Sequence, residues 1–217
     1  KPYMQYCREE VLVMEYVDGI SIRNTNKLLE QGYDLDEIGD KMLENYAKQI
    51  LQDGFFHADP HPGNIVIYGG QIVYLDLGLM GRLSTRDRLG FEKAVEAVGL
   101  RSASALMDAL MSFSIARDLA AIDQPNLLAE LDVILDRYGT AEVESIDIGQ
   151  FLGDILNVTR QTKVTLPSSV TMVSRGLVTM EGTLLEYVGS FNMVDIINKH
   201  IKRTKETSDD FKDTVKE

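Results

Sequence analysis

The sequence has 217 residues, of which 44% are hydrophobic and 26% charged, so it is long enough and apolar enough to form one or two globular domains. A net charge of −12 argues against general binding of nucleic acid, which requires a basic surface. The single cysteine, Cys7, excludes an internal disulfide and favours a reducing compartment. The first residues lack a secretory leader, and no apolar run reaches about 18 residues, so we expect the chain as given to be soluble.

The first predicted elements are a strand and a helix. Val11 to Met14 form an apolar run that is typical of a buried strand, and Glu15 to Val17 continue it as an extended segment. The helix begins at Asp34, which can form a capping box with Glu37 three residues later. Gly54 ends it. Apolar residues at spacings of three and four form one buried stripe on this helix: Ile38, Met42, Leu43, Tyr46, Ile50 and Leu51.

Residues 54–78 contain the most informative motif in the chain. His57, Asp59 and Asn64 form the pattern H-x-D-x-x-x-x-N, and Asp76-Leu77-Gly78 begins twelve residues after Asn64. Kinase catalytic and metal-binding loops have this order and about this spacing, with the first aspartate orienting or deprotonating the nucleophile. Separately each residue is common in turns or as a structural histidine. The ordered combination predicts a phosphotransferase.

The spacing of this motif also has a physical reason. Two apolar runs, residues 65–68 and 71–75, are separated by Gly69-Gly70, which predicts a hairpin with a two-residue turn. Such a hairpin brings Asn64, before its first strand, beside Asp76, after its second. An amide oxygen and a carboxylate are ligands that Mg²⁺ accepts while it keeps waters and nucleotide phosphates. The sequence therefore predicts a magnesium site at the open end of the hairpin.

Beyond Gly78 the sequence predicts helices to the end of the chain. They cover about 85–98, 103–113, 125–139, 148–161, 167–187 and 192–206, with Ser84 and Ser102 as caps and Pro125 and Pro167 in first turns. The last helix carries a basic cluster in an acidic protein, formed by Lys199, His200, Lys202, Arg203 and Lys205. A solvated face explains such a cluster, and a segment adjacent to a membrane is the alternative.

With these motifs in place, the chain resembles the C-terminal lobe of the UbiB-type atypical kinases, a family that supports ubiquinone and related isoprenoid-lipid metabolism. The resemblance is carried by GFFHADPHPGN at 54–64, LDLGLMGR at 75–82, and LPS and LVTMEG at 166–168 and 177–182. It implies a mainly α (α+β) fold, namely a protein-kinase-like C-lobe with a hinge strand, a catalytic-loop β-hairpin and a large helical tail. The expected divisions are 1–19 for the last N-lobe strand and hinge, 20–83 for the catalytic core and 84–217 for the helical subdomain.

The resemblance also implies the site residues and the cofactors, ATP and Mg²⁺. The implied set is Asp59 and His57 as catalytic residues, Asn64 and Asp76 as metal ligands, and Met14, Glu15, Val17 and His61 as nucleotide-binding residues, the first three from the hinge that binds adenine. For the hinge segment, a plain strand and turn is the alternative. His61 stands where many kinases have a phosphate-contacting lysine, so its charge depends on pH. No A-P-E sequence follows Gly78, which favours a lipid, a small molecule or water over a protein as the phosphoryl acceptor.

Only ten residues precede Val11, so the phosphate-covering loop, the strand lysine and the family's Lys-x-Gly-Gln helix are missing. We therefore expect this chain alone to bind nucleotide weakly and to have little activity, and its longer parent to be an active kinase or ATPase. The expected partners are nucleotide, isoprenoid lipids or quinone-pathway enzymes, and a membrane surface. The expected location is the cytoplasm, with the parent peripheral to or anchored in the inner membrane.

Two alternatives remain open from the sequence. Aminoglycoside- and choline-kinase-like phosphotransferases share a very similar H-x-D-x-x-x-x-N string, although Asp-Leu-Gly and the helical tail argue against them. A non-catalytic pseudokinase scaffold for lipid-pathway enzymes would use the same fold without chemistry. The presence together of Asp59, Asn64 and Asp76 argues against that scaffold.

Overall fold

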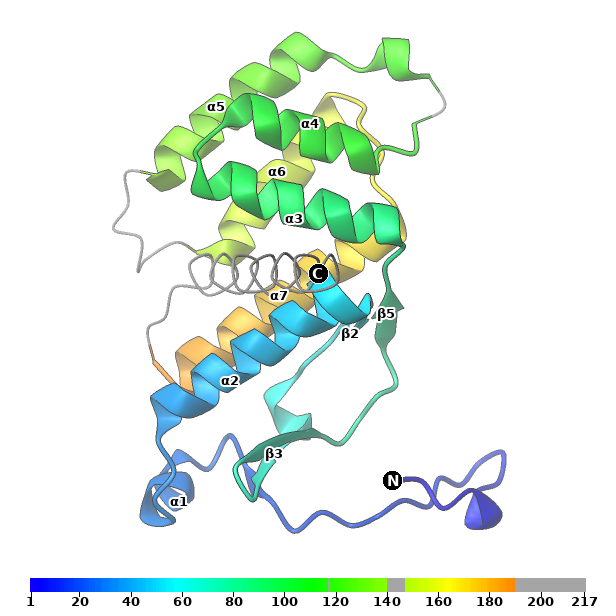
Figure 1. Ribbon diagram of the computed structural model, residues 1–217, viewed down its shortest axis with the longest axis vertical. Coiled ribbons are helices and arrows are strands. Elements are labelled where there is room, and N and C mark those ends of the chain that lie inside the picture. Colours follow the sequence, from blue (N-terminus) through cyan, green and yellow to red (C-terminus); the bar gives the residue numbers. More distant parts are fainter. Residues whose placement is uncertain (117, 140–146, 190–217) are drawn as a thin grey trace, which may run out of the picture.

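The computed structural model describes residues 1–116, 118–139 and 147–189, arranged as Figure 1 shows. A small β region and the N-terminal segment lie at one end of the molecule, two long helices cross its middle, and four more helices fill the other end. The predicted helix at 192–206, with its basic cluster, lies outside the described residues. The described part of the chain is mainly helical, as predicted, and contains two small antiparallel sheets.

The first sheet contains the predicted hairpin. Its strands are β1 (Ile20–Ser21), β3 (Ile65–Tyr68) and β4 (Gln71–Tyr74), in the order β1-β3-β4 with antiparallel pairing. Gly69 and Gly70 form the turn with φ values of 56° and 75°, which glycine adopts without steric cost. The hairpin prediction is confirmed, with the second strand ending one residue earlier than expected.

The second sheet was not predicted from the sequence. It pairs β2 (Phe55–His57) with β5 (Met80–Arg82), and Phe56 lies opposite Gly81. A Cβ atom on Gly81 would lie 2.2 Å from the Phe56 ring, so only glycine permits this pairing while the buried ring stays in place. Each strand has three residues, too few for a period-two pattern to stand out in the sequence.

The helix that precedes the catalytic motif forms as predicted, except that Asp34 caps it alone and the Glu37 side chain pairs with Lys41 instead of completing a capping box. After the short α1 (Thr25–Glu30) comes α2 (Leu35–Lys48). Its cap is Asp34, whose carboxylate accepts hydrogen bonds from the backbone amides of Asp36 and Glu37 at 2.9 and 3.3 Å. A π-helical turn (Gln49–Asp53) extends α2 to Gly54, which has the left-handed φ of 61°. The predicted stripe is buried apart from Leu51, which is partly buried.

The tail helices match the predicted ranges to within two residues. They are α3 (Thr85–Gly99), α4 (Ala103–Phe113), α5 (Gln124–Gly139), α6 (Ile148–Gln161) and α7 (Ser168–Tyr187). Ser84 and Ser102 cap their helices through side-chain oxygens, as expected. Within the described ranges, none of the helices combines the length and apolar character needed to cross a bilayer.

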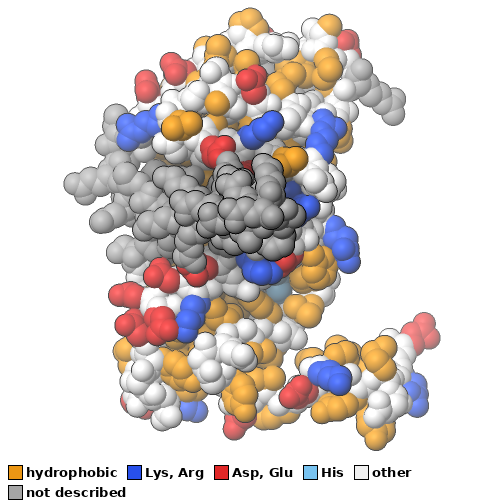
Figure 2. All heavy atoms as spheres, in the orientation of Figure 1, with side chains coloured by type: hydrophobic (Ala, Val, Ile, Leu, Met, Phe, Trp, Pro, Cys, Tyr) orange, Lys and Arg blue, Asp and Glu red, His pale blue; other side chains and the backbone are white. Residues whose placement is uncertain are grey.

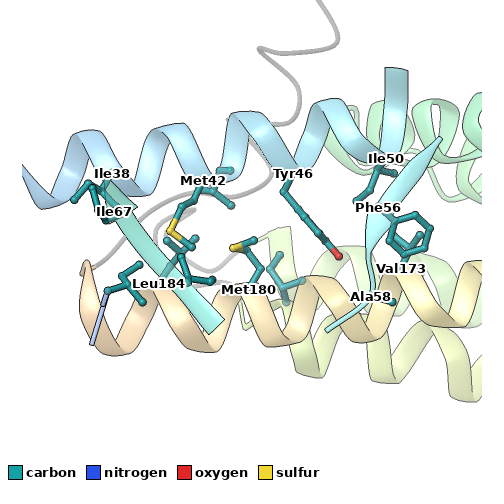
Figure 3. Close-up of a cluster of buried hydrophobic side chains, with 14 of the residues drawn as sticks. Ile38, Met42, Tyr46, Ile50, Phe56, Ala58, Ile67, Val173, Met180 and Leu184 are labelled. Carbon is teal, nitrogen blue, oxygen red and sulfur yellow. The ribbon is translucent and has the colours of Figure 1, made fainter. Parts of the chain in front are cut away.

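Two hydrophobic clusters hold the molecule together. The first lies between α2, the β region and α7, where Tyr46 and Met42 of α2 face Val173 and Met180 of α7 (Figure 3). The second is formed by residues of α3 to α6 and the start of α7. Since α7 contributes to both clusters, it joins the helical tail to the β region. Glu181 of α7 also links this helix to α6 by hydrogen bonds. Its buried carboxylate accepts them from the first two backbone amides of α6 at 2.7 and 3.0 Å.

The prediction of a buried strand at Val11 to Met14 is wrong. Residues 1–19 contain isolated bridges, Pro2 with Met14 and Arg8 with Val11, but no strand. Val11 and Leu12 are 53% and 68% exposed. The strands of the first sheet begin only at residue 20, and Figures 1 and 2 show the N-terminal segment extending away from the body of the molecule, with apolar side chains on its surface. An apolar run becomes a buried strand only where another element covers it.

Candidate active site

Two loops that carry the predicted site residues lie side by side. The catalytic loop, residues 57–64, begins at the last residue of β2, and the metal loop, residues 75–79, precedes β5. The amide of Ala58 donates a hydrogen bond to the carbonyl of Leu79 at 3.0 Å, and the amide of Leu75 donates one to the carbonyl of Asn64 at 2.8 Å. The two small sheets thus join the loops at both ends. The predicted proximity of Asn64 to the start of the metal loop is confirmed at the level of the backbone.

His57 connects the two loops through both of its ring nitrogens. Its Nδ1 accepts a hydrogen bond from the amide of Asp59 at 3.2 Å, so the proton is on Nε2, which donates to the carbonyl of Asp76 at 2.6 Å. The residue is only 3% exposed. Its backbone is held as well, because its amide donates to the Gln49 side chain at 2.9 Å and its carbonyl accepts from the Tyr46 hydroxyl at 2.8 Å. His57 is therefore fixed from four directions.

Tyr46 of α2 and Gly176 of α7 meet at the backbone carbonyl of His57. Burial raises the pKa of Tyr46 well above its usual value, so its hydroxyl stays protonated and donates to His57. A Cβ atom on Gly176 would lie 1.9 Å from that hydroxyl and 3.1 Å from the His57 carbonyl. Helix α7 consequently approaches the catalytic loop more closely than a larger residue would allow. The sequence placed Tyr46 in an apolar stripe and did not single out Gly176.

Asp59 has a cationic neighbour on α7. The guanidinium of Arg175 lies 3.6 Å from the Asp59 carboxylate, and the two side chains are 65% and 37% exposed. The hydroxyl of Thr183, two turns further along α7, reaches the carbonyl of Pro60 at 3.5 Å. The helical tail therefore lines one side of the catalytic loop. Sequence reasoning missed Arg175, since the separation of 116 positions from Asp59 gives no local signal.

The predicted metal ligands come from neighbouring loops. Asp76 is exposed, and its Oδ1 accepts a hydrogen bond from the amide of Gly78 at 2.8 Å, which sets the bend of the metal loop. Asn64 is partly buried at the base of the hairpin. Across the described parts of the chain, no three or more His, Cys, Asp or Glu side chains gather into a closed metal site. One amide oxygen and one carboxylate suit Mg²⁺, which keeps waters and phosphate oxygens as its other ligands.

Of the predicted nucleotide-binding residues, only His61 lies in one of the two loops. His61 belongs to the catalytic loop, is exposed, and accepts a hydrogen bond from the amide of Gly63 at 3.1 Å through Nδ1. Met14 and Glu15 are exposed and Val17 is partly buried, all in the N-terminal segment that Figure 1 shows running away from α2 and α7. None of these three belongs to the first hydrophobic cluster.

An apolar cavity of about 120 Å³ lies in the helical tail, apart from the two loops. Residues of α3, α4, α6 and α7 line it, among them Phe91, Leu110, Phe151 and Leu177. Ser174 supplies the one hydroxyl in a lining that otherwise has apolar side chains. It contains none of the residues predicted to bind metal or nucleotide, so we place the chemistry at the loops.

The hairpin between the catalytic and metal loops, set on a helical base, defines the C-terminal part of a protein-kinase-like fold. Comparison with known families agrees with this class. Residues 1–110 match the family model of the ABC1 atypical kinase-like domain, and residues 131–187 match that of the UbiB helical domain. The chain belongs to the ABC1/UbiB atypical kinase family, as the resemblance predicted. This match favours that family over the aminoglycoside- and choline-kinase-like alternative.

Similar proteins occur in bacteria and plants. A Clostridium pasteurianum protein named for the hydrogenase 1 5′ region is 32% identical over 196 residues, which is 90% of this chain and 37% of that protein. ACTIVITY OF BC1 COMPLEX KINASE 7, chloroplastic, of Arabidopsis thaliana is 32% identical over 184 residues, 83% of this chain and 26% of its own length. An aarF domain-containing protein kinase of the same plant, also chloroplastic, is 34% identical over 183 residues, 84% of this chain and 25% of its length. The chain thus spans between a quarter and two fifths of these relatives.

Proposed function

We propose that this chain is the metal-binding half of a Mg-ATP-dependent kinase or ATPase that supports isoprenoid quinone (ubiquinone-type) lipid biosynthesis. The observation that carries the proposal is the double hydrogen bond of His57 to the backbones of Asp59 and Asp76. It sets the residue proposed as the base and a proposed metal ligand in one rigid unit, which phosphoryl transfer requires because its catalysis depends mostly on positioning.

Each residue of the unit has a distinct proposed role. Asp59 orients the acceptor hydroxyl or water and takes its proton. Asn64 and Asp76 hold Mg²⁺, which supplies positive charge to the phosphate oxygens when bound. His57 is a positioning residue, because both of its ring nitrogens are used within the protein. The hinge segment, through Met14, Glu15 and Val17, and the exposed His61 complete the proposed nucleotide contacts.

The proposed acceptor is a lipid, a small molecule or water. After the metal loop the chain passes through β5 directly into α3, which begins at Thr85, so only a short segment separates Gly78 from the helical tail. A long activation segment of the kind that presents a peptide is absent from that stretch of the described chain. The resemblance to the UbiB-type kinases favours a role in isoprenoid-lipid metabolism, and we propose that the parent acts at a membrane surface.

The decisive experiment uses the full-length parent. Asp59→Asn and Asp76→Asn are each expected to lower the rate of ATP hydrolysis by at least about a hundredfold and to abolish rescue of quinone synthesis in a deletion strain. Asp132→Asn, which changes an exposed carboxylate on α5, should leave both unchanged. Survival of quinone synthesis with Asp76→Asn would favour the non-catalytic scaffold instead.

The same proposal predicts weak nucleotide binding by this chain alone. The residues proposed to contact adenine lie in an N-terminal segment that the rest of the described chain does not cover. Calorimetric titration with Mg-ATP should therefore show no binding in the micromolar range. Micromolar affinity would mean that the chain already contains a complete nucleotide site.

A further inference from the structure

The catalytic loop contains no permanently charged cation. Residues 57–64 include neither lysine nor arginine. Its two basic side chains are His57, which is buried, and His61, which is exposed and whose Nδ1 accepts a hydrogen bond from the amide of Gly63. Phosphoryl transfer spreads negative charge over the oxygens of the moving group, and a fixed cation beside that group lowers the barrier strongly. Beside the proposed Mg²⁺, a cation from another element would meet this need.

Arg175 of α7 is placed to meet that need. Its guanidinium lies 3.6 Å from the Asp59 carboxylate, which is longer than a hydrogen bond. Within the described residues, the N–H groups of this guanidinium therefore have no acceptor at hydrogen-bond distance. The side chain is 65% exposed, whereas its neighbour Gly176 fits tightly against the catalytic loop. The helix backbone at Arg175 is therefore fixed while the guanidinium remains accessible.

We propose that Arg175 is a catalytic residue whose guanidinium contacts the transferred phosphoryl group beside Asp59. The inference rests on the proposed function and adds to it a residue from the helical tail. The planar guanidinium suits this role, because it is always charged and can donate two parallel hydrogen bonds to phosphate oxygens. The helical tail thereby completes the active site in addition to supporting it.

The chemical step assigns one role to each group. The acceptor oxygen, from a hydroxyl or water, forms a bond to the γ-phosphorus while its proton passes to the Asp59 carboxylate. The bond between the γ-phosphorus and the bridging oxygen breaks, and ADP leaves with that electron pair. Arg175 keeps its proton throughout and donates hydrogen bonds to the phosphoryl oxygens as their charge develops.

The test compares Arg175→Met and Arg175→Lys with Arg160→Met in the full-length parent. Arg160 is exposed near the end of α6, so its variant removes the same charge elsewhere. Arg175→Met should lower kcat for ATP hydrolysis by about a hundredfold while KM changes less than about threefold. It should weaken binding of Mg-ADP with aluminium fluoride, a mimic of the transferred group, by a similar factor and leave Mg-ADP binding unchanged. Arg175→Lys should recover part of the loss, and Arg160→Met should resemble the wild type.

The outcomes separate this inference from the proposed function. If Asp76→Asn abolishes hydrolysis and Arg175→Met does not, the role of Arg175 is overturned and the proposed function stands. If Arg175→Met lowers kcat without weakening aluminium fluoride binding, or only together with a fall of the unfolding midpoint by more than about 4 °C, its role is structural and the inference also fails. If Asp76→Asn has no effect on hydrolysis, both proposals fail.

Discussion

The catalytic loop and the N-terminal segment differ sharply in how the rest of the chain holds them. The loop is bound to the metal loop through His57, to α2 through Tyr46, to the π-helical turn after α2 through Gln49, and to α7 through the close approach of Gly176. The N-terminal segment, residues 1–19, carries isolated bridges within itself and exposes most of its large apolar side chains. One family model covers both regions, yet only the loop is rigidly positioned by contacts within the described residues. Membership of a kinase family therefore does not by itself show that both halves of a nucleotide site are formed.

The largest effect should follow from disturbing the contact between α7 and the catalytic loop. Gly176→Ala places a methyl group 1.9 Å from the Tyr46 hydroxyl, so we expect the free energy of unfolding to fall by at least about 3 kcal/mol. Urea denaturation of the chain measures this loss. Gly182→Ala on the same helix has nothing within 4 Å of the new methyl and should stabilise the chain by about 0.5–1 kcal/mol.

A double variant tests whether the clash is the cause. Tyr46→Phe removes the hydroxyl that the new methyl would meet first, leaving a ring carbon 3.2 Å away. Combined with Gly176→Ala, it should therefore recover part of the lost stability, although the 3.1 Å approach to the His57 carbonyl persists. Strictly additive losses in the double variant would show that α7 and the Tyr46 hydroxyl do not meet in this way.

A smaller effect is expected from cutting the link between the two loops. His57→Phe keeps a buried ring but loses both hydrogen bonds, leaving the amide of Asp59 and the carbonyl of Asp76 without these partners. We expect a loss of about 2 kcal/mol in stability, measured by the same denaturation, and a large fall in the ATPase rate of the parent. His61→Phe, at an exposed position of the same loop, is the matched control and should cost less than about 1 kcal/mol. Equal losses for the two variants would contradict the assigned linking role.

The smallest effect should come from the N-terminal segment. Leu12 is 68% exposed, so Leu12→Ser should change the free energy of unfolding by no more than about 0.5 kcal/mol. Leu131→Ser, at a fully buried position of α5, should cost about 3 kcal/mol or more. A loss above about 1 kcal/mol for Leu12→Ser would show that the segment is held more firmly than its exposure indicates.

Local features of the sequence were sufficient for most of the secondary structure. Asp34, Ser84 and Ser102 were predicted as helix caps and act as caps, because capping is decided within a few residues. Gly69-Gly70 predicted the hairpin for the same reason, since its turn conformation depends on those two residues. The motif with Asp59, Asn64 and Asp76 identified the family through its order and spacing, although the roles of its residues and the divisions at 19 and 83 stay predictions.

Only the tertiary structure decided what surrounds that motif. Whether Val11 to Met14 is buried depends on a covering element, which an apolar run cannot specify by itself. The pairing of β2 with β5, the link made by His57, and the placement of Gly176 and Arg175 all join residues far apart in sequence. Such contacts depend on how the helices and sheets pack in space, so the periodicity and spacing of residues along the chain do not predict them.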